Sequence, residues 1–276
     1  MDSIEFTSAE KLALRSSYRT LRELTSDVIT AQDAKQLRML VHAGAQENLF
    51  GRTRFGHHPV LHSLSVAIEL CGSMGADRNM VLAVLLYNLG VDMDNDNHDI
   101  QTLIRGLRKV SSLYSKQATV KSDNFRKLLL TFAEDIRVII IMIVDRLVLM
   151  KAINHHPAED LVREVAFEAS YLYAPLAHRL GLYKIKSELE DMSLKYTDRD
   201  MYSRIARKLN ETKKSRDAYI ESFIAPVKEA LIKQGLKFDI KGRTKSIFSI
   251  WNKMKKQNTD LDHIYDLFAI RVILDV

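Results

Sequence analysis

Glu134–Ile153 reads EDIRVIIIMIVDRLVLMKAI and is the most hydrophobic run in the chain. Neither Gly nor Pro interrupts the run, and it is too long for one strand, so it predicts a helix that is buried on nearly all sides. The shorter piece Val138–Val144 is also compatible with a buried strand, an alternative that periodicity alone leaves open. The stretch predicts the core of an amino-terminal helical domain.

One carboxylate, Asp145, lies inside this apolar run and is followed directly by Arg146. A charge in a protein core must be paired, bound to a metal or kept neutral, because burying it without a partner is costly. An ion pair with Arg146 or another basic residue is the simpler explanation, and a metal site is the alternative. In either case, the partner of Asp145 should lie at the centre of the amino-terminal domain.

The composition is that of a globular protein of one large or two ordinary domains. The chain has 276 residues, of which 46% are hydrophobic and 28% charged, enough to bury a substantial core. A single cysteine, Cys71, excludes an intrachain disulfide framework and fits a reducing compartment. The first residues contain no apolar signal segment, and no run is long enough to span a membrane. We therefore expect a cytoplasmic protein without a membrane partner.

Basic residues are concentrated in one part of the chain. Residues 199–256 contain 16 Lys or Arg against 6 Asp or Glu, whereas the net charge of the whole chain is only +6. This asymmetry predicts a polyanionic ligand, such as a nucleotide or a nucleic acid, although solvated helix faces account for part of it. Binding to RNA is the weaker alternative, because aromatic residues do not interleave with the basic cluster.

The remaining pattern predicts a mainly α chain with a mixed α/β end. One helix is expected from Thr7 toward Ala31, and a second follows it through about Asn48. Further helices are expected at 61–74, 79–89, 100–110, 125–132, 134–153, from 157 to a kink or break near Pro175, and at 185–196, 201–214 and 218–234. After Gly235 we expect a strand at 236–240, a turn at 242–245, a helix at 246–256 and a buried strand near the end. Two strands do not make a stable sheet, so we expect the chain to be a fragment of a longer protein.

Three stretches carry a family resemblance: YAPLAHRLGLYKIKSELEDMSLKY at Tyr173–Tyr196, GRTKSIFSIWNKM at Gly242–Met254 and YDLFAIRVIL at Tyr265–Leu274. Their sequence, order and spacing resemble the long RelA/SpoT-type alarmone synthetase/hydrolase family. The resemblance implies an all-helical HD-type hydrolase domain at 1–197, connecting helices at 198–235, and the start of a nucleotidyltransferase-like synthetase domain at 236–276. Such enzymes transfer pyrophosphate from ATP to the 3′-hydroxyl of GDP or GTP, or hydrolyse the product.

The hydrolase site implied by the resemblance is incomplete in this sequence. Its positions correspond to His62, Tyr87, Asn88, Val91, Asp92 and Asp145. Tyr87 and Asn88 stand where the family has an adjacent His–Asp pair, and they cannot replace an imidazole and a carboxylate as ligands of a divalent ion. Val91 stands where the family has a catalytic Glu. We expect no Mn²⁺ in this pocket and no hydrolase activity, with His62 a hydrogen-bonded structural residue.

The synthetase pattern is retained as far as the chain extends. Resemblance assigns the contacts with ATP to Arg243, Lys245, Ser249, Lys253 and Arg271, and the Mg²⁺ ligand and catalytic carboxylate to Asp266. The spacing of Lys245, Ser249 and Lys253 predicts that one helix face presents all three. Ammonium and hydroxyl groups suit phosphate oxygens, and a guanidinium can stack on a base.

Two functions are therefore compatible with the sequence. The first is a fragment of a GTP/GDP pyrophosphokinase of the stringent response, whose inactive hydrolase domain serves as a scaffold or regulator. Its partners would be ATP and GDP or GTP, with Mg²⁺ as cofactor, and any ribosome contact would need carboxy-terminal domains that this sequence lacks. The second is a non-catalytic guanine-nucleotide-binding or interaction module.

Overall fold

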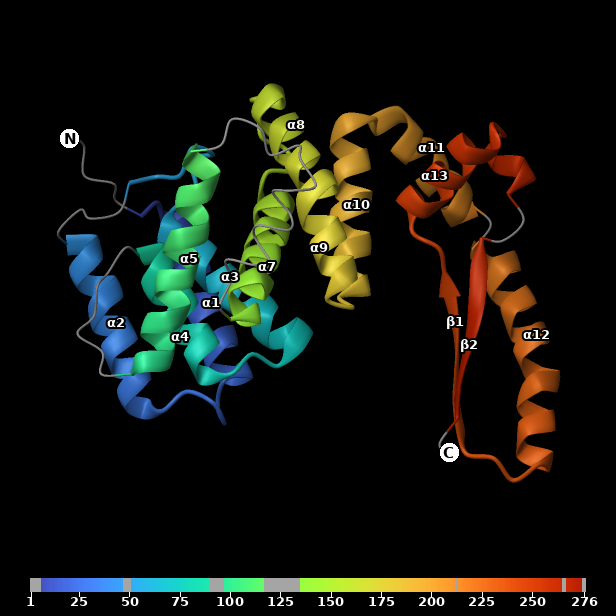
Figure 1. Ribbon diagram of the computed structural model, residues 1–276, viewed down its shortest axis with the longest axis horizontal. Helices are drawn as coiled ribbons and strands as arrows, with labels where there is room; N and C mark the ends of the chain where they lie inside the picture. The colour runs from blue at the N-terminus through green and yellow to red at the C-terminus, as the bar shows by residue number, and fades with distance from the viewer. Residues whose placement is uncertain are drawn as a thin grey trace. The chain divides into compact units, whose positions relative to one another are not determined.

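The computed structural model (Figure 1) describes residues 6–46, 51–89, 97–116, 135–211, 213–264 and 267–274. The chain forms two compact units, Met1–Leu189 and Glu190–Val276, and the boundary between them falls inside α10 (Tyr183–Thr197). Helices dominate both units, so the predicted mainly α class is confirmed. The helix that we expected at 125–132 lies outside the described residues.

Among its described residues, the first unit consists of helices and the loops that connect them, without a strand. Its elements are α1 (Ser8–Leu24), α2 (Ala31–Gln46), α3 (Pro59–Met74), α4 (Arg78–Leu89), α5 (His98–Lys116), α7 (Ile136–Ala152), α8 (Glu159–Glu168), the π-helical turn η1 (Ala169–Tyr173), α9 (Ala174–Arg179) and the first half of α10. Within the bundle, α3 packs on α1, α4 and α7, and α5 packs on α4 and α7.

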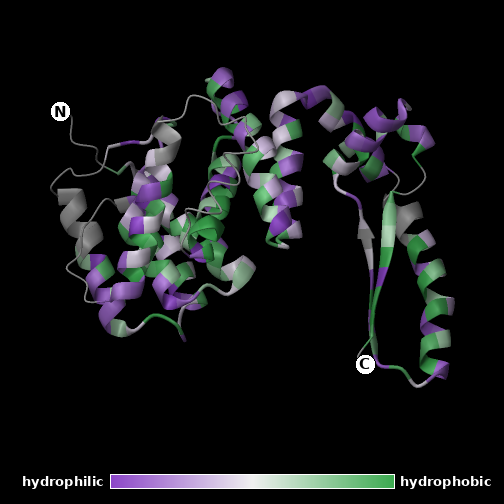
Figure 2. Cartoon of the chain, in the orientation of Figure 1, coloured by the Kyte–Doolittle hydropathy of each residue, from purple (hydrophilic) through white to green (hydrophobic). Residues whose placement is uncertain are grey.

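The helix α7 is the core element that the sequence predicted. Asp135 begins it as the N-cap, because its carboxylate accepts a hydrogen bond from the backbone N–H of Arg137 at 2.8 Å. Ile143, Val144 and Leu147 are fully buried, and α7 is coloured hydrophobic along most of its length in Figure 2. Burial of each such side chain stabilises the fold by about 1.5–3 kcal/mol. The buried residues of α7 therefore form a central part of the core of the first unit.

The first predicted helix ends earlier than its pattern suggested. Thr7 and Glu10 form the predicted capping box, but α1 stops at Leu24 instead of continuing toward Ala31. The reason is a second capping pair: Thr30 and Asp33 exchange backbone-to-side-chain hydrogen bonds at 3.0 and 3.2 Å and begin α2. The continuous amphipathic pattern concealed this boundary.

The second unit combines helices with a two-stranded antiparallel sheet. Its elements after α10 are α11 (Arg199–Glu211), α12 (Lys213–Lys233), β1 (Phe238–Thr244), α13 (Ile247–Gln257), the 3-10 turn η2 (Leu261–His263) and β2 (Phe268–Leu274). Ile205, Ile250, Met254, Leu261 and Ile264 form its core. In the ladder, Phe238 pairs with Leu274 and Thr244 pairs with Phe268. The predicted strand–helix–strand order is confirmed.

The turn predicted at 242–245 is wrong, because Gly242–Thr244 belong to β1. The glycine does not form a turn. It allows α12 to approach the backbone of β1 closely. A Cβ atom at Gly242 would lie 2.7 Å from Cγ2 of Ile220 in α12, closer than carbon atoms can pack. A glycine inside a strand lets a neighbouring element approach the backbone, and the sequence alone does not separate this use from a turn.

Candidate functional site

A pocket of about 440 Å³ in the first unit is lined by three of the residues expected at the hydrolase site, Tyr87, Asn88 and Asp145. Asn88 and Tyr87 come from α4, Ser111 from α5, Asp145 and Arg146 from α7, and Glu168 and Tyr173 from α8 and η1. The structure thus brings Tyr87, Asn88 and Asp145 together, as the resemblance implied. Val91 and Asp92 lie outside the described residues.

Asp145 is paired with His62 of α3. The Nε2 atom of His62 lies 2.8 Å from Oδ1 of Asp145, and the two side chains are 14% and 38% exposed. Burial lowers the pKa of His62, but the hydrogen bond and the charge of Asp145 together outweigh it, so the net effect is a raised pKa. The sequence led us to expect an ion pair between Asp145 and Arg146 or another basic residue, and the structure supplies His62 as such a partner.

His62 also borders a second pocket, of about 300 Å³, together with His57, His58 and Val148. His58 is buried and begins α3, with its Nδ1 atom 3.3 Å from the backbone nitrogen of Val60. His57 has a lowered pKa because of burial, to which the nearby His62 and His156 add their charge. His57, His58 and His62 therefore line one pocket beside the start of α3.

Arg146, the residue next to Asp145, has different partners. Its Nη1 atom lies 2.8 Å from a carboxylate oxygen of Glu168, and both side chains are mostly buried. Its guanidinium also lies over the ring of Tyr173, 4.6 Å from the centroid, and Nη2 lies 3.3 Å from the tyrosine hydroxyl. Asp145 and Arg146 therefore contact different walls of the pocket although they are adjacent on α7. Their neighbouring positions in the sequence did not predict these separate partners.

A π-helical turn places Tyr173 in the wall. In η1 the backbone N–H of Ala174 bonds to the carbonyl of Ala169, five residues earlier. The wide turn ends at Tyr173, two residues before Pro175, which cannot donate a helical hydrogen bond. The sequence predicted a kink or break near Pro175, and the structure has a π-helical turn there, with helical backbone on both sides. This turn delivers an aromatic side chain to the pocket.

Tyr87 and Asn88 do not supply metal ligands of the type that the family uses. Burial raises the pKa of Tyr87, and a hydrogen bond with Ser111 only partly opposes this, so the phenol stays protonated at neutral pH. Across the residues that the structure describes, no three His, Cys, Asp or Glu side chains gather in a way that could hold a metal ion. A neutral phenol and a carboxamide are weaker ligands for a divalent ion such as Mn²⁺ than an imidazole and a carboxylate.

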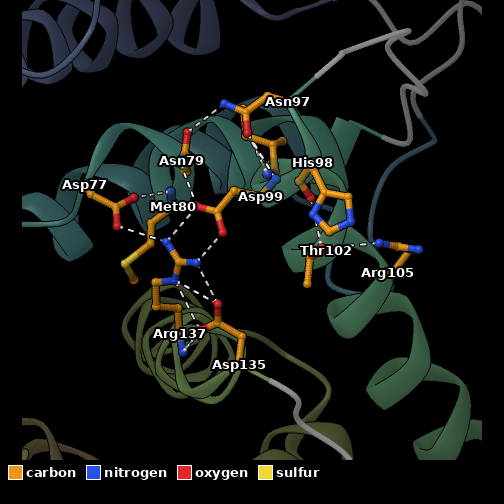
Figure 3. A network of polar contacts seen from close by, with 11 residues as sticks. Asp77, Asn79, Met80, Asn97, His98, Asp99, Thr102, Arg105, Asp135 and Arg137 are labelled. Carbon is orange, nitrogen blue, oxygen red and sulfur yellow. Dashed lines mark hydrogen bonds and ion pairs between the residues drawn. The ribbon is translucent and has the colours of Figure 1, made fainter.

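Arg137 connects α4, α5 and α7, which line the pocket, through hydrogen bonds and ion pairs at the start of α7 (Figure 3). Its guanidinium bonds to Asp135 at 2.6 Å, to Asp99 of α5 at 2.6 Å and to Asp77, beside α4, at 3.2 Å. The Nδ2 atom of Asn79 in α4 donates to the same Asp99 at 2.6 Å. The hydrogen bonds that Arg137 donates to these three carboxylates raise its pKa, so the guanidinium stays charged over the whole physiological pH range.

In the second unit, the described residues expected at the ATP site come from β1, β2 and the start of α13. In the ladder, Arg243 pairs with Ala269. Arg271 pairs with Lys241, which precedes Arg243 by two residues on β1. Ser246 is the N-cap of α13, so Lys245 lies before the helix. The prediction that one helix face presents Lys245, Ser249 and Lys253 together is therefore wrong. Asp266 lies outside the described residues.

The backbone nevertheless brings two expected segments together. The N–H of Lys245 donates to the carbonyl of Leu267 at 2.9 Å, so the residue that follows Asp266 in the chain lies beside Lys245. The hydroxyl oxygen of Ser249 lies 2.8 Å from that of Ser246. A further contact, which no sequence pattern predicted, joins the first turn of α13 to α10, because the backbone N–H of Phe248 donates to the carboxylate of Asp191.

Two family models match the chain. Residues 41–183 match the HD domain, and residues 242–276 match a region found in RelA and SpoT proteins. Among the residues that the structure describes, no helix is both long and apolar enough to cross a bilayer. The family matches cover the pocket around Asp145 and the segment from β1 to the end of the chain.

Curated relatives carry two kinds of name. The chain is 30% identical over 253 residues to the guanosine-3′,5′-bis(diphosphate) 3′-pyrophosphohydrolase of Aquifex aeolicus (strain VF5), a match that covers 88% of this chain and 36% of that protein. It is 34% identical over 236 residues to the GTP pyrophosphokinase of Myxococcus xanthus, covering 81% and 31%. The GTP pyrophosphokinase of Escherichia coli (strain K12) is 31% identical over 223 residues, covering 75% and 30%. The chain spans about a third of the length of these relatives, and with both of its family matches it belongs to the RelA/SpoT family and contains an HD domain at residues 41–183.

Proposed function

We propose that this chain is the amino-terminal part of a GTP pyrophosphokinase whose HD pocket no longer hydrolyses alarmone. The observation that supports this most is the side-chain set around Asp145, where Tyr87 and Asn88 occupy the wall in which the family has a His–Asp pair. Without those donors the pocket lacks the ligands that activate a water molecule. The HD domain would then act as a scaffold or regulator of the synthetase.

The same proposal assigns ATP to the second unit. Lys245 and Ser249 would contact its phosphates, with Lys253 close by, and Arg243 and Arg271 would lie against the adenine. Asp266, whose chain neighbour Leu267 bonds to Lys245, would hold the Mg²⁺ that neutralises charge on the polyphosphate. In the whole protein, GDP or GTP would accept the pyrophosphate at its 3′-hydroxyl.

Titration of the purified chain with MgATP tests this assignment. The only tryptophan, Trp251, lies in α13 two residues after Ser249, so its emission reports binding there. Lys245→Ala should weaken MgATP binding about tenfold or more, because a charged contact with phosphate is lost. Lys256→Ala is the matched control, an exposed lysine in the last turn of the same helix, and should leave affinity unchanged. Equal affinity of the Lys245→Ala variant and the unaltered chain would contradict the assignment.

The second candidate function is a guanine-nucleotide-binding module without catalysis. It is favoured by the volume of the pocket, about 440 Å³, and by its mixture of a cation, Arg54, with the polar groups of Asn88 and Tyr173. Calorimetric titration with GDP, GTP and guanosine tetraphosphate separates the two candidates. Binding that is lost in Arg54→Ala, and kept in the exposed control Arg163→Ala, would support this module, whereas no binding would remove it.

A further inference from the structure

Asp191 of α10 makes a contact that no sequence pattern indicated. Its Oδ1 atom accepts a hydrogen bond from the backbone N–H of Phe248 at 2.8 Å, across 57 residues of chain. Phe248 lies in the first turn of α13, whose N-cap is Ser246. The backbone N–H groups of a first turn have no partner within their own helix, so a carboxylate from another helix is a fitting acceptor.

The first turn of α13 is therefore capped from two sides. The hydroxyl of Ser246 accepts from the N–H of Ser249 at 3.2 Å, and Asp191 accepts from the N–H of Phe248. Both donors are occupied by the protein itself. Phosphate binding near this turn would thus depend on side chains such as Lys245, and not on these two N–H groups.

Asp191 also lies close to α11. Burial is the main reason that the pKa of Tyr202 is raised, and the negative charge of Asp191 adds to it. Beneath these groups, Ile205 of α11 packs with Ile250 and Met254 of α13 in the core of the second unit. The carboxylate thus joins α10 to the α11–α13 layer at the point where α13 begins.

The segment Lys245–Ser249 is consequently fixed at three points. Lys245 is bonded to Leu267 at 2.9 Å, the N-cap Ser246 closes the first turn, and Asp191 fixes Phe248. A short segment held in this way keeps its two end residues, Lys245 and Ser249, at a fixed separation. Fixed geometry of binding groups reduces the entropy cost of engaging a ligand.

We propose that Asp191 is a positioning residue for the phosphate-binding segment Lys245–Ser249. It touches no substrate and acts through the start of α13. The inference rests on the proposed binding of ATP in this unit.

The test uses Asp191→Ala, which removes the acceptor, and Asp191→Asn, which keeps an oxygen for the N–H of Phe248. Asp198→Ala is the matched control, because Asp198 caps α11 in the same unit, accepting from Met201 at 3.1 Å, without contact to α13. The measurements are MgATP titration of the whole chain, followed by Trp251 emission, and amide hydrogen exchange at Phe248. Exchange reports the fixing of the turn independently of ATP.

Asp191→Ala should weaken MgATP binding about tenfold and speed exchange at Phe248 about tenfold. Asp191→Asn should stay within about threefold of the unaltered chain in both measurements, because the acceptor is retained, and Asp198→Ala should leave both unchanged. Unchanged MgATP affinity in Asp191→Ala, with the unaltered chain binding normally, would overturn this inference alone. Failure of the unaltered chain to bind MgATP would overturn the proposed function and this inference with it.

Discussion

At the scale of single residues, the His62–Asp145 pair explains how an acidic side chain persists on the core helix. The carboxylate is not deeply buried, and its partner is a histidine whose pKa it raises. Two side chains that the family resemblance assigned to one site are bonded directly to each other, with 2.8 Å between Nε2 of His62 and Oδ1 of Asp145. The pair is a stabilising contact whose strength depends on the proton of His62.

The pH dependence of stability follows from that proton. His62 has a folded pKa above its ordinary value of 6.5, so its contribution to stability is complete below pH 6.5 and is lost as pH rises through the folded pKa. Asp145→Asn should lower the free energy of unfolding at pH 6 by about 1 kcal/mol, a small value because solvent screens a side chain that is 38% exposed. The loss at pH 9 should be smaller.

Urea unfolding of the two proteins at pH 6 and pH 9 measures the difference. Asp160→Asn is the control, since it neutralises an exposed carboxylate in the first turn of α8 and should change stability equally at both pH values. An Asp145→Asn variant whose loss of stability is the same at pH 6 and pH 9 would contradict the pairing.

At the scale of elements, Arg137 holds the start of α7 against α4 and α5. Removing it would leave Asp77, Asp99 and Asp135 close together without their shared cation. Arg137→Ala should lower the free energy of unfolding by roughly 2 kcal/mol, because a mostly buried guanidinium is lost while solvent still screens its partners. Denaturant unfolding at pH 7 checks this.

The control for Arg137 is Arg163→Ala. Arg163 is 61% exposed and pairs with Glu159, four residues earlier on the same helix, at 3.4 Å. Such exposed pairs are worth about 0.3–0.5 kcal/mol, so the control should unfold close to the unaltered chain. Equal effects of the two substitutions would show that the Arg137 network contributes nothing beyond a surface pair.

The contact between β1 and α12 makes a second prediction at this scale. Gly242→Ala would place a Cβ atom 2.7 Å from Cγ2 of Ile220, so the second unit should lose about 1–3 kcal/mol through overpacking. The double variant Gly242→Ala/Ile220→Ala should recover part of this loss, because the clashing methyl group is gone. Thermal unfolding of the single and double variants measures the coupling.

Gly72→Ala in α3 provides the comparison for that experiment. An added Cβ atom at Gly72 meets nothing within 4 Å, and alanine favours a helix over glycine by about 1 kcal/mol. Gly72→Ala should therefore be neutral or stabilising. No recovery in the double variant would place the cost of Gly242→Ala somewhere other than Ile220.

At the scale of the whole molecule, the sequence predicted what depends on local pattern. The apolar run of α7, the capping box at Thr7 and the helical irregularity near Pro175 follow from periodicity, caps and proline chemistry. The gathering of Tyr87, Asn88 and Asp145 in one pocket followed from the family resemblance. The local features need no knowledge of distant contacts, whereas the gathering in the pocket needed the family resemblance.

Several features that the sequence did not predict depend on contacts between distant segments. Asp191 is 57 residues from Phe248, and the direct bond between His62 and Asp145 spans 83 residues, although the resemblance had assigned both to one site. Gly242 resembled a turn residue because its close neighbour, Ile220, lies on another element. Single-sequence patterns carry no distance information of this kind, so such pairs appear only in the structure.

The central claim, that the HD pocket around Asp145 is not a hydrolase, has a direct measurement. It is the release of pyrophosphate from the 3′ position of guanosine tetraphosphate by the purified chain in the presence of Mn²⁺. We predict no release above a control without protein, and no difference between the unaltered chain and Asp145→Asn. Mn²⁺-dependent release that disappears in Asp145→Asn would contradict the account.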